Sequence, residues 1–163
     1  LKNARLGGAY LEGADLTVAN LKRTSLGGAH LKGANLIGAN LEYAFLRKAN
    51  LEEALLGGAH LKGASLGEAH LDGANLVGTY LNEAYLIGAH LDGVNLIGAH
   101  LERSTMSEAH LDGVNLAGAH LDGVKLLTDK QLAKAILCRT ALPEEFNPEL
   151  RNRDCHEMGL DPD

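Results

Sequence analysis

Leucine recurs at every fifth position from Leu1 to Leu126, and a small residue stands two places before almost every leucine in this series. Of these 26 positions, 25 hold Leu and one holds Met106. An α-helix would spread leucines five residues apart around all its sides, and a flat strand would send alternate leucines to opposite faces. The period therefore predicts neither a helix nor an ordinary strand, and it indicates a chain that turns once per five residues.

A longer period of 20 residues is also present, because the segments 71–80, 91–100 and 111–120 align with one another at that spacing. Four sides of five residues close one coil, with Leu and the small residue pointing inward. Neighbouring coils then stack through backbone hydrogen bonds at about 4.8 Å. The pattern predicts an all-β solenoid with four sides and about 6.5 coils, which span residues 1–127.

Glycine follows the same pattern, since 19 of the 20 glycines lie in the repeats, four of them directly after the leucine and 15 one place later. Tight corners need residues that adopt positive φ without strain. We interpret these glycines as corner residues. None belongs to a phosphate-binding Gly motif that opens a helix.

The units GADLT, GANLI and GVNLA resemble the A-[D/N]-L-x-x repeat of the pentapeptide-repeat family, and the resemblance covers about 126 residues without an interrupting loop. It implies a right-handed quadrilateral β-helix. Members of the family include proteins that protect DNA gyrase from quinolones and are thought to imitate duplex DNA in shape and charge. The projecting loops common in those members are missing from this sequence.

The period ends at Leu127, and residues 128–163 are expected to form a short α-helical C-terminal cap and tail. Thr128 and Gln131 are spaced as a capping box. An apolar helical stripe follows in Leu132, Ala133, Ile136 and Leu137. Asn147 and Pro148 suit a second helix start. Such a cap would cover the unpaired edge of the last coil.

Both cysteines, Cys138 and Cys155, lie in this C-terminal segment. The segment is similar to tails of the family with a C-x-T-x-[L/M]-P motif followed by N-x-x-C. A disulfide between the two cysteines would close a small loop and stabilise the cap. Two free thiols in a reducing cytosol are the alternative, and the sequence leaves both open.

Composition and charge argue against several classes of function. The net charge of −6 argues against nonspecific nucleic-acid binding, and the few aromatic residues provide no stacking platform for single strands. No apolar run has the length of a membrane helix, and no signal peptide is visible. The chain begins with Leu and within a repeat, as expected of a fragment or a processed product.

The outward positions carry the candidate chemistry, and seven of the eight histidines stand directly before a repeat leucine. At 20 residues per coil, His70, His90 and His110 form one column, beside a column of Asp72, Asp92 and Asp112. Another set, His60, His100 and His120, lies two sides away with Tyr80 in the gap. Asn35, Asn75, Asn95 and Asn115 form a further column that suits an amide ladder. The His and Asp columns are either solvated surface or a site that binds a divalent metal or responds to pH.

The sequence favours a non-catalytic rod that binds a macromolecular partner, another protein, through its outer faces. No nucleophile or carboxylate pair is placed against a base in a cleft, so we expect neither an enzyme nor a cofactor. The candidate partner face is the acidic column of Glu52, Asp72, Asp92 and Asp112. Alternatives are a DNA-imitating protein that binds DNA gyrase and a metal- or pH-responsive surface.

Two further expectations concern assembly and location. The N-terminal coil has no visible cap, so a homodimer through that end is one expected assembly. A cytoplasmic location is favoured, or an oxidising compartment if Cys138 and Cys155 form a disulfide.

Overall fold

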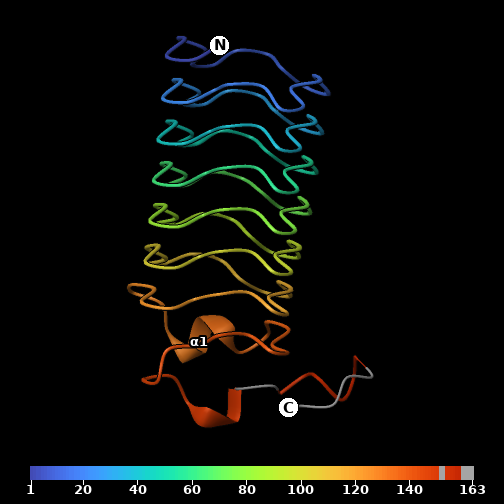
Figure 1. The fold of residues 1–163 in the computed structure, drawn as a ribbon, viewed down its shortest axis with the longest axis vertical. Coiled ribbons are helices and arrows are strands. Elements are labelled where there is room, and N and C mark those ends of the chain that lie inside the picture. Colours follow the sequence, from blue (N-terminus) through green and yellow to red (C-terminus); the bar gives the residue numbers. More distant parts are fainter. Residues whose placement is uncertain (151–152, 159–163) are drawn as a thin grey trace.

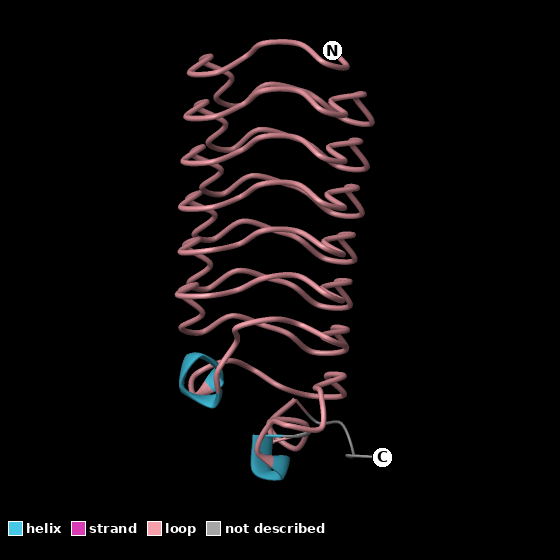
Figure 2. Cartoon of the chain, turned by 90° about the vertical axis from the view of Figure 1, so that its left-hand side faces the viewer, coloured by secondary structure: helices cyan, strands magenta, loops and turns pink. Residues whose placement is uncertain are grey.

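Successive turns of the chain stack along one axis, with the N-terminus at one end of a rod and the C-terminal segment at the other (Figure 1). The structure is a computed structural model, and it describes residues 1–150 and 153–158. Each turn takes 20 residues and has four sides. Figure 2 shows the same stack from the side, with both short helices below the last turns.

The coils are held in register by isolated parallel β-bridges between residues 20 apart. One coil pairs with the next through a bridge on each side, as in Tyr10–His30 and Asp15–Asn35. The His30 N–H donates to the Ala9 carbonyl at 2.9 Å, and the His30 carbonyl accepts from the Leu11 N–H at 2.7 Å. Because each side is so short, the described residues contain no continuous strand, and the predicted four-sided solenoid is built from single bridges.

Leucine and alanine fill the axis. Every repeat position from Leu21 to Leu121, Met106 included, is at most 2% exposed. The small residue beside each leucine lies close to the wall and is also buried. At the N-terminal end the core is open, because Leu1 is 61% exposed and Leu6, Leu11 and Leu16 are only partly buried.

Each corner is a turn closed by a backbone hydrogen bond across three residues, as from the Ala14 N–H to the Leu11 carbonyl at 3.1 Å. The second corner residue has positive φ, and the fifteen glycines at this place are all left-handed, with Gly13 at 65°. The four glycines directly after leucine do not share this conformation. Non-glycine residues occupy the remaining corners in the same strained conformation, and among them is the β-branched Val18 at φ 49°.

The coil slips by one residue at Leu126. The repeat predicts that this leucine points inward, and the prediction is wrong: Leu126 is 68% exposed with φ 57°, and Leu127 packs against the core in its place. Pairing then resumes at a spacing of 21, with Ile136 on Asn115 and Ala141 on His120. The chain therefore continues to coil beyond residue 127.

Helix α1, Asp129–Leu132, begins at Thr128 with the predicted capping box to Gln131. The predicted stripe through Leu137 is wrong beyond Leu132, because Ala135 and Leu137 are buried in the coil wall on either side of the Ile136 bridge. Stacking on the preceding coil outweighs helical periodicity here. The second predicted start is a 3-10 helix, η1, Pro148–Leu150, in which the Asn147 side chain accepts from the Glu149 N–H.

A disulfide joins Cys138 and Cys155, and both residues are buried against Ala117. It ties the segment after η1 back to the last turn of the coil. No helix among the described residues has the length and apolar character needed to cross a membrane.

Candidate interaction surface

The outer surface has four faces that differ in composition. Each coil contributes five residues to each face. We define the acidic face as residues 9–13 and their equivalents every 20 residues up to 109–113. It carries a single basic residue, Lys32, and six acidic ones: Glu12, Glu52, Glu53, Asp72, Asp92 and Asp112. The face that follows it, residues 14–18 and their equivalents up to 114–118, has only Asp15 as a charged residue. Negative charge is therefore concentrated on one face of the rod.

Histidines stack on the acidic face, because the backbone register holds neighbouring rings at the spacing of the coils. The ring centroids of His70 and His90 are 4.6 Å apart, as are those of His90 and His110. The column expected from the sequence is therefore present. On the far side of the rod, a second stack contains Tyr80 between His60 and His100, followed by His120.

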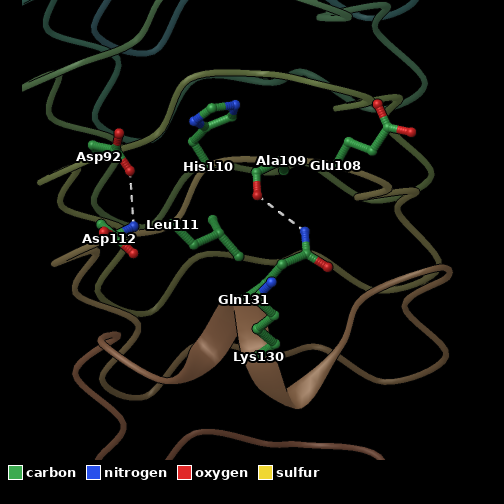
Figure 3. Close-up of a pocket in the computed structure, with 8 residues that line it drawn as sticks. All are labelled: Asp92, Glu108, Ala109, His110, Leu111, Asp112, Lys130 and Gln131. Carbon is green, nitrogen blue, oxygen red and sulfur yellow. Dashed lines mark hydrogen bonds between the residues drawn. The ribbon is translucent and has the colours of Figure 1, made fainter.

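The four members of the candidate partner face differ in their contacts. Glu52 accepts a hydrogen bond from Lys32 at 3.0 Å. Asp92 accepts the backbone N–H of Asp112 at 2.8 Å (Figure 3). Asp112 in turn pairs with Lys134, which the turn after α1 brings to the end of the column. The Asp72 side chain has no hydrogen-bond or ion-pair partner among the described residues.

The acidic column therefore ends beside a cation. Lys134 is a neighbour of Asp112 only because the chain folds back after Leu126. The Asp112 carboxylate raises the pKa of the Lys134 ammonium by a hydrogen bond and by its charge. Asp72 and Asp92, in the middle of the face, form no ion pair among the described residues, and the charge of Asp92 contributes to the raised pKa of Lys134.

A shallow hollow of about 410 Å³ lies where α1 meets the last coil of the acidic face (Figure 3). Three acidic side chains, Asp92, Glu108 and Asp112, line it together with His110 and Lys130. Sequence reasoning missed Glu108 and Lys130, because neither belongs to the Asp column. The hollow is open to solvent and is suited to a side chain of a partner.

The asparagine column has a local role. The side-chain oxygen of Asn75 accepts the Val77 N–H at 3.1 Å, and Asn95 and Asn115 bond in the same way to Ile97 and Ala117. Each asparagine therefore closes the corner that follows it. Among the described residues these side-chain amides form no hydrogen bonds with one another, in contrast to the expected amide ladder.

Ion pairs between adjacent coils lie on the other faces. Lys22 pairs with Glu42, 20 residues later, and the hydrogen bond from Lys22 lowers the pKa of that carboxyl below its usual range. Arg47 and Lys48 both contact Glu68, whose pKa is lowered chiefly by the hydrogen bond from Arg47. Basic groups are thus present on faces other than the acidic one.

Residues 1–33, 18–52, 49–88 and 89–126 match the sequence model of pentapeptide repeats. None of the curated protein sequences matches this chain.

Many solved structures are similar to it, among them the following three. A pentapeptide repeat protein of the Arabidopsis thaliana thylakoid lumen is 32% identical, with 72% of this chain and 79% of that chain covered and a TM-score of 0.49. HetL of Nostoc sp. strain PCC 7120, a pentapeptide repeat protein involved in heterocyst differentiation regulation, is 32% identical, with 88% and 74% covered and a TM-score of 0.35. QnrB1, a plasmid-mediated fluoroquinolone resistance protein, is 21% identical, with 80% and 70% covered and a TM-score of 0.47.

Proposed function

This chain belongs to the pentapeptide repeat family, and we propose that it is a non-catalytic rod whose acidic face binds a basic surface of another protein. The inward positions are filled with leucine and alanine. The hollows on the outer surface of the described residues are open to solvent, and they do not form an enclosed active-site cavity. Binding through an outer face is the function that this architecture supports best.

The concentration of negative charge on one face carries the proposal. Six acidic residues share that face with one lysine. Asp72 and Asp92, in its middle, form no ion pair among the described residues. Complementary charge steers association and selects partners more than it adds affinity. A stacked β-coil holds these carboxylates at fixed spacing, so little conformational entropy is lost on binding.

The experiment compares two triple variants of the full chain. One changes Asp72, Asp92 and Asp112 to Asn, and the matched control changes the far-side acids Glu83 and Glu102 to Gln and Asp122 to Asn. Both lose three negative charges, so a general charge effect is shared between them. Each protein is used to capture binding partners from an extract of the native host at low salt. We expect wild type and the control to retain the same partner proteins, and the acidic-face variant to lose them. Equal retention by both variants would contradict the proposal.

The gyrase-directed alternative is less well supported by the charge distribution. Duplex DNA is negatively charged on all sides, whereas this rod carries Arg47 and Lys48 on one face and an almost uncharged face beside the acidic one. A supercoiling assay with gyrase and a quinolone tests it. Absence of any effect at micromolar protein would remove this alternative.

We propose that the C-terminal segment caps the rod. Helix α1 places Leu132 in the core, and its Gln131 side chain donates to carbonyls of the last regular coil. At the other end, the N–H and carbonyl groups of Arg5, Tyr10, Asp15 and Asn20 have no backbone partner in the described residues, although the corresponding groups of the next coil are paired. A second copy could pair with this edge. Sedimentation at several concentrations tests this homodimer, and a concentration-independent monomer would exclude it.

A further inference from the structure

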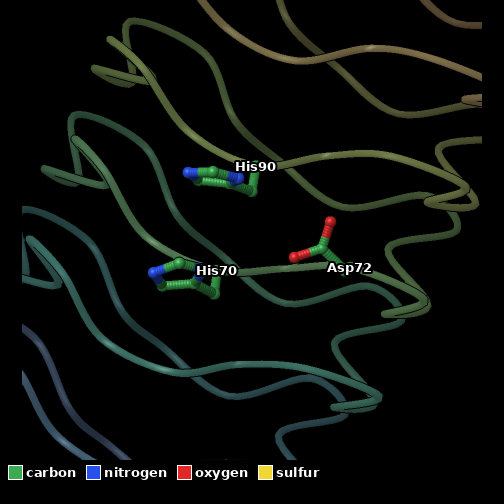
Figure 4. Close-up of side chains that lie close together, drawn as sticks. All are labelled: His70, Asp72 and His90. Atoms are coloured by element: carbon green, nitrogen blue, oxygen red, sulfur yellow. The ribbon is translucent and has the colours of Figure 1, made fainter.

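Two histidines and one aspartate of neighbouring coils come together on the acidic face. One ligand atom each from His70, Asp72 and His90 lie within 4.8 Å of one another. His70 and Asp72 flank the inward Leu71, so both project outward, and His90 stacks on His70 from the next coil. Figure 4 shows the Asp72 carboxylate beside the two stacked rings.

This group differs from the otherwise identical set one coil further on. The Asp92 carboxylate accepts the backbone N–H of Asp112, and the Asp112 carboxylate pairs with Lys134. Asp72 makes neither kind of contact among the described residues. The repeat therefore provides two histidines and one aspartate in this arrangement twice, and of the two aspartates only Asp72 has a carboxylate without a hydrogen bond or ion pair among the described residues.

We propose that His70, Asp72 and His90 bind one divalent transition-metal ion of the class that imidazole favours, such as Zn²⁺, Cu²⁺ or Ni²⁺. Two imidazole nitrogens and one carboxylate oxygen suit these ions. Ca²⁺ and Mg²⁺ prefer sites built from oxygen alone. The rings must turn from their stacked position so that their nitrogens converge, and the outer face has room for this because His70 is exposed. Water would complete the coordination on the solvent side.

Bound metal would join two adjacent coils and place two positive charges in the middle of the acidic face. Binding to the folded state alone also raises its stability. The site does not depend on the partner proposed above.

The test is calorimetric titration of the full chain with ZnCl₂, NiCl₂ and MgCl₂ near neutral pH. We expect one Zn²⁺ or Ni²⁺ ion per chain at this site and no heat with Mg²⁺. His90→Gln and Asp72→Asn should each weaken binding at least about tenfold. The matched controls His110→Gln and Asp92→Asn, one coil further on, should bind within about twofold of wild type.

Thermal unfolding of each variant in EDTA shows whether it is folded, so a loss of binding is assigned to the ligand. Imidazole NMR signals provide a second readout, and Zn²⁺ should shift those of His70 and His90 and leave those of His100 and His120 in place. Absence of heat with wild type and Zn²⁺ or Ni²⁺ would overturn the proposal. An equal loss of affinity in His110→Gln and His90→Gln would also overturn it, because the histidines would then bind as a diffuse surface.

Discussion

The side-chain amide of Gln131 donates to the carbonyl oxygen of Ala109 at 3.0 Å, where every earlier coil supplies a backbone N–H. The N–H of His30 fills this place for Ala9, and that of His110 fills it for Ala89. One side chain thus replaces the next coil at the end of the ladder. The same amide also reaches the Met106 carbonyl at 2.9 Å.

Replacing Gln131 by Glu should lower the free energy of unfolding by about 2 kcal/mol, because a donor to two carbonyls becomes an acceptor facing them. The carboxylate still accepts the Thr128 N–H, and the backbone N–H of residue 131 still donates to the Thr128 hydroxyl, so the capping box retains both of its bonds. Urea denaturation measures the change. Lys130→Ala on the same helix is the control and should change stability by less than about 0.5 kcal/mol. Equal effects of the two substitutions would show that Gln131 does not hold the edge.

Val18→Gly should stabilise the protein by about 1 kcal/mol, although it removes a side chain. Val18 has φ 49° and is 75% exposed, so its β-branched side chain is strained and buries little surface. Gly58, at the equivalent corner two coils further on, has φ 63° with no atom close to an added Cβ. Gly58→Val should therefore destabilise by a similar amount. A loss of stability in Val18→Gly, measured by thermal unfolding, would show that the unfolded chain's gain in entropy outweighs the strain.

Removal of the buried hydroxyl of Thr79 should lower the stability of the protein, whereas removal of that of Ser104 should not. Thr79 donates to the Leu56 carbonyl of the preceding coil at 3.0 Å, whereas the Ser104 hydroxyl has no hydrogen-bond partner in the described structure. Thr79→Val should cost about 1 kcal/mol, and Ser104→Ala should be neutral or stabilising. Equilibrium unfolding in urea compares the two. Destabilisation by Ser104→Ala of more than about 1 kcal/mol would mean that its hydroxyl has a partner, such as a buried water.

Reduction of the disulfide should destabilise the C-terminal segment by about 3 kcal/mol or less, since the bridge spans 17 residues. We expect no titratable thiol in the native protein without reductant and two after reduction and unfolding. Cys138→Ala with Cys155→Ala should unfold at the same temperature with and without reductant. Two free thiols in the native protein would contradict the bridge.

The ion pair of Lys22 with Glu42 should make stability depend on pH in the acid range. The pKa of Glu42 is lowered in the folded state, so its contribution is present above the ordinary carboxyl pKa near about 4.3 and is lost as the pH falls through the folded value. Glu42→Gln should be less stable than wild type by about 0.5 kcal/mol at pH 7, and the difference should disappear as the pH falls through the folded pKa of Glu42. In a Lys22→Met background the pH 7 difference should shrink. If it persists unchanged there, the pair does not cause it.

The four-sided coil, its leucine core and the columns of outward residues follow from the sequence alone, because a period of five with a longer period of 20 has one compact solution. The histidine column could be predicted from the 20-residue period alone. The capping box at Thr128 and Gln131 was also readable, since it depends on residues three apart in the chain.

Other features depend on contacts between distant residues. Leu126 and Leu127 are chemically identical, and only packing against the core decides that Leu127 points inward and Leu126 is exposed. Ile136 and Leu137 fit a helix as well as a coil by spacing, and pairing with Asn115 selects the coil. The three His–Leu–Asp units are the same in sequence, and only folding shows that Asp92 bonds to a backbone N–H, Asp112 to Lys134, and Asp72 to neither. A short-range pattern determines which side chains face outward, and the three-dimensional packing of residues 20 or more apart determines which of them remain available.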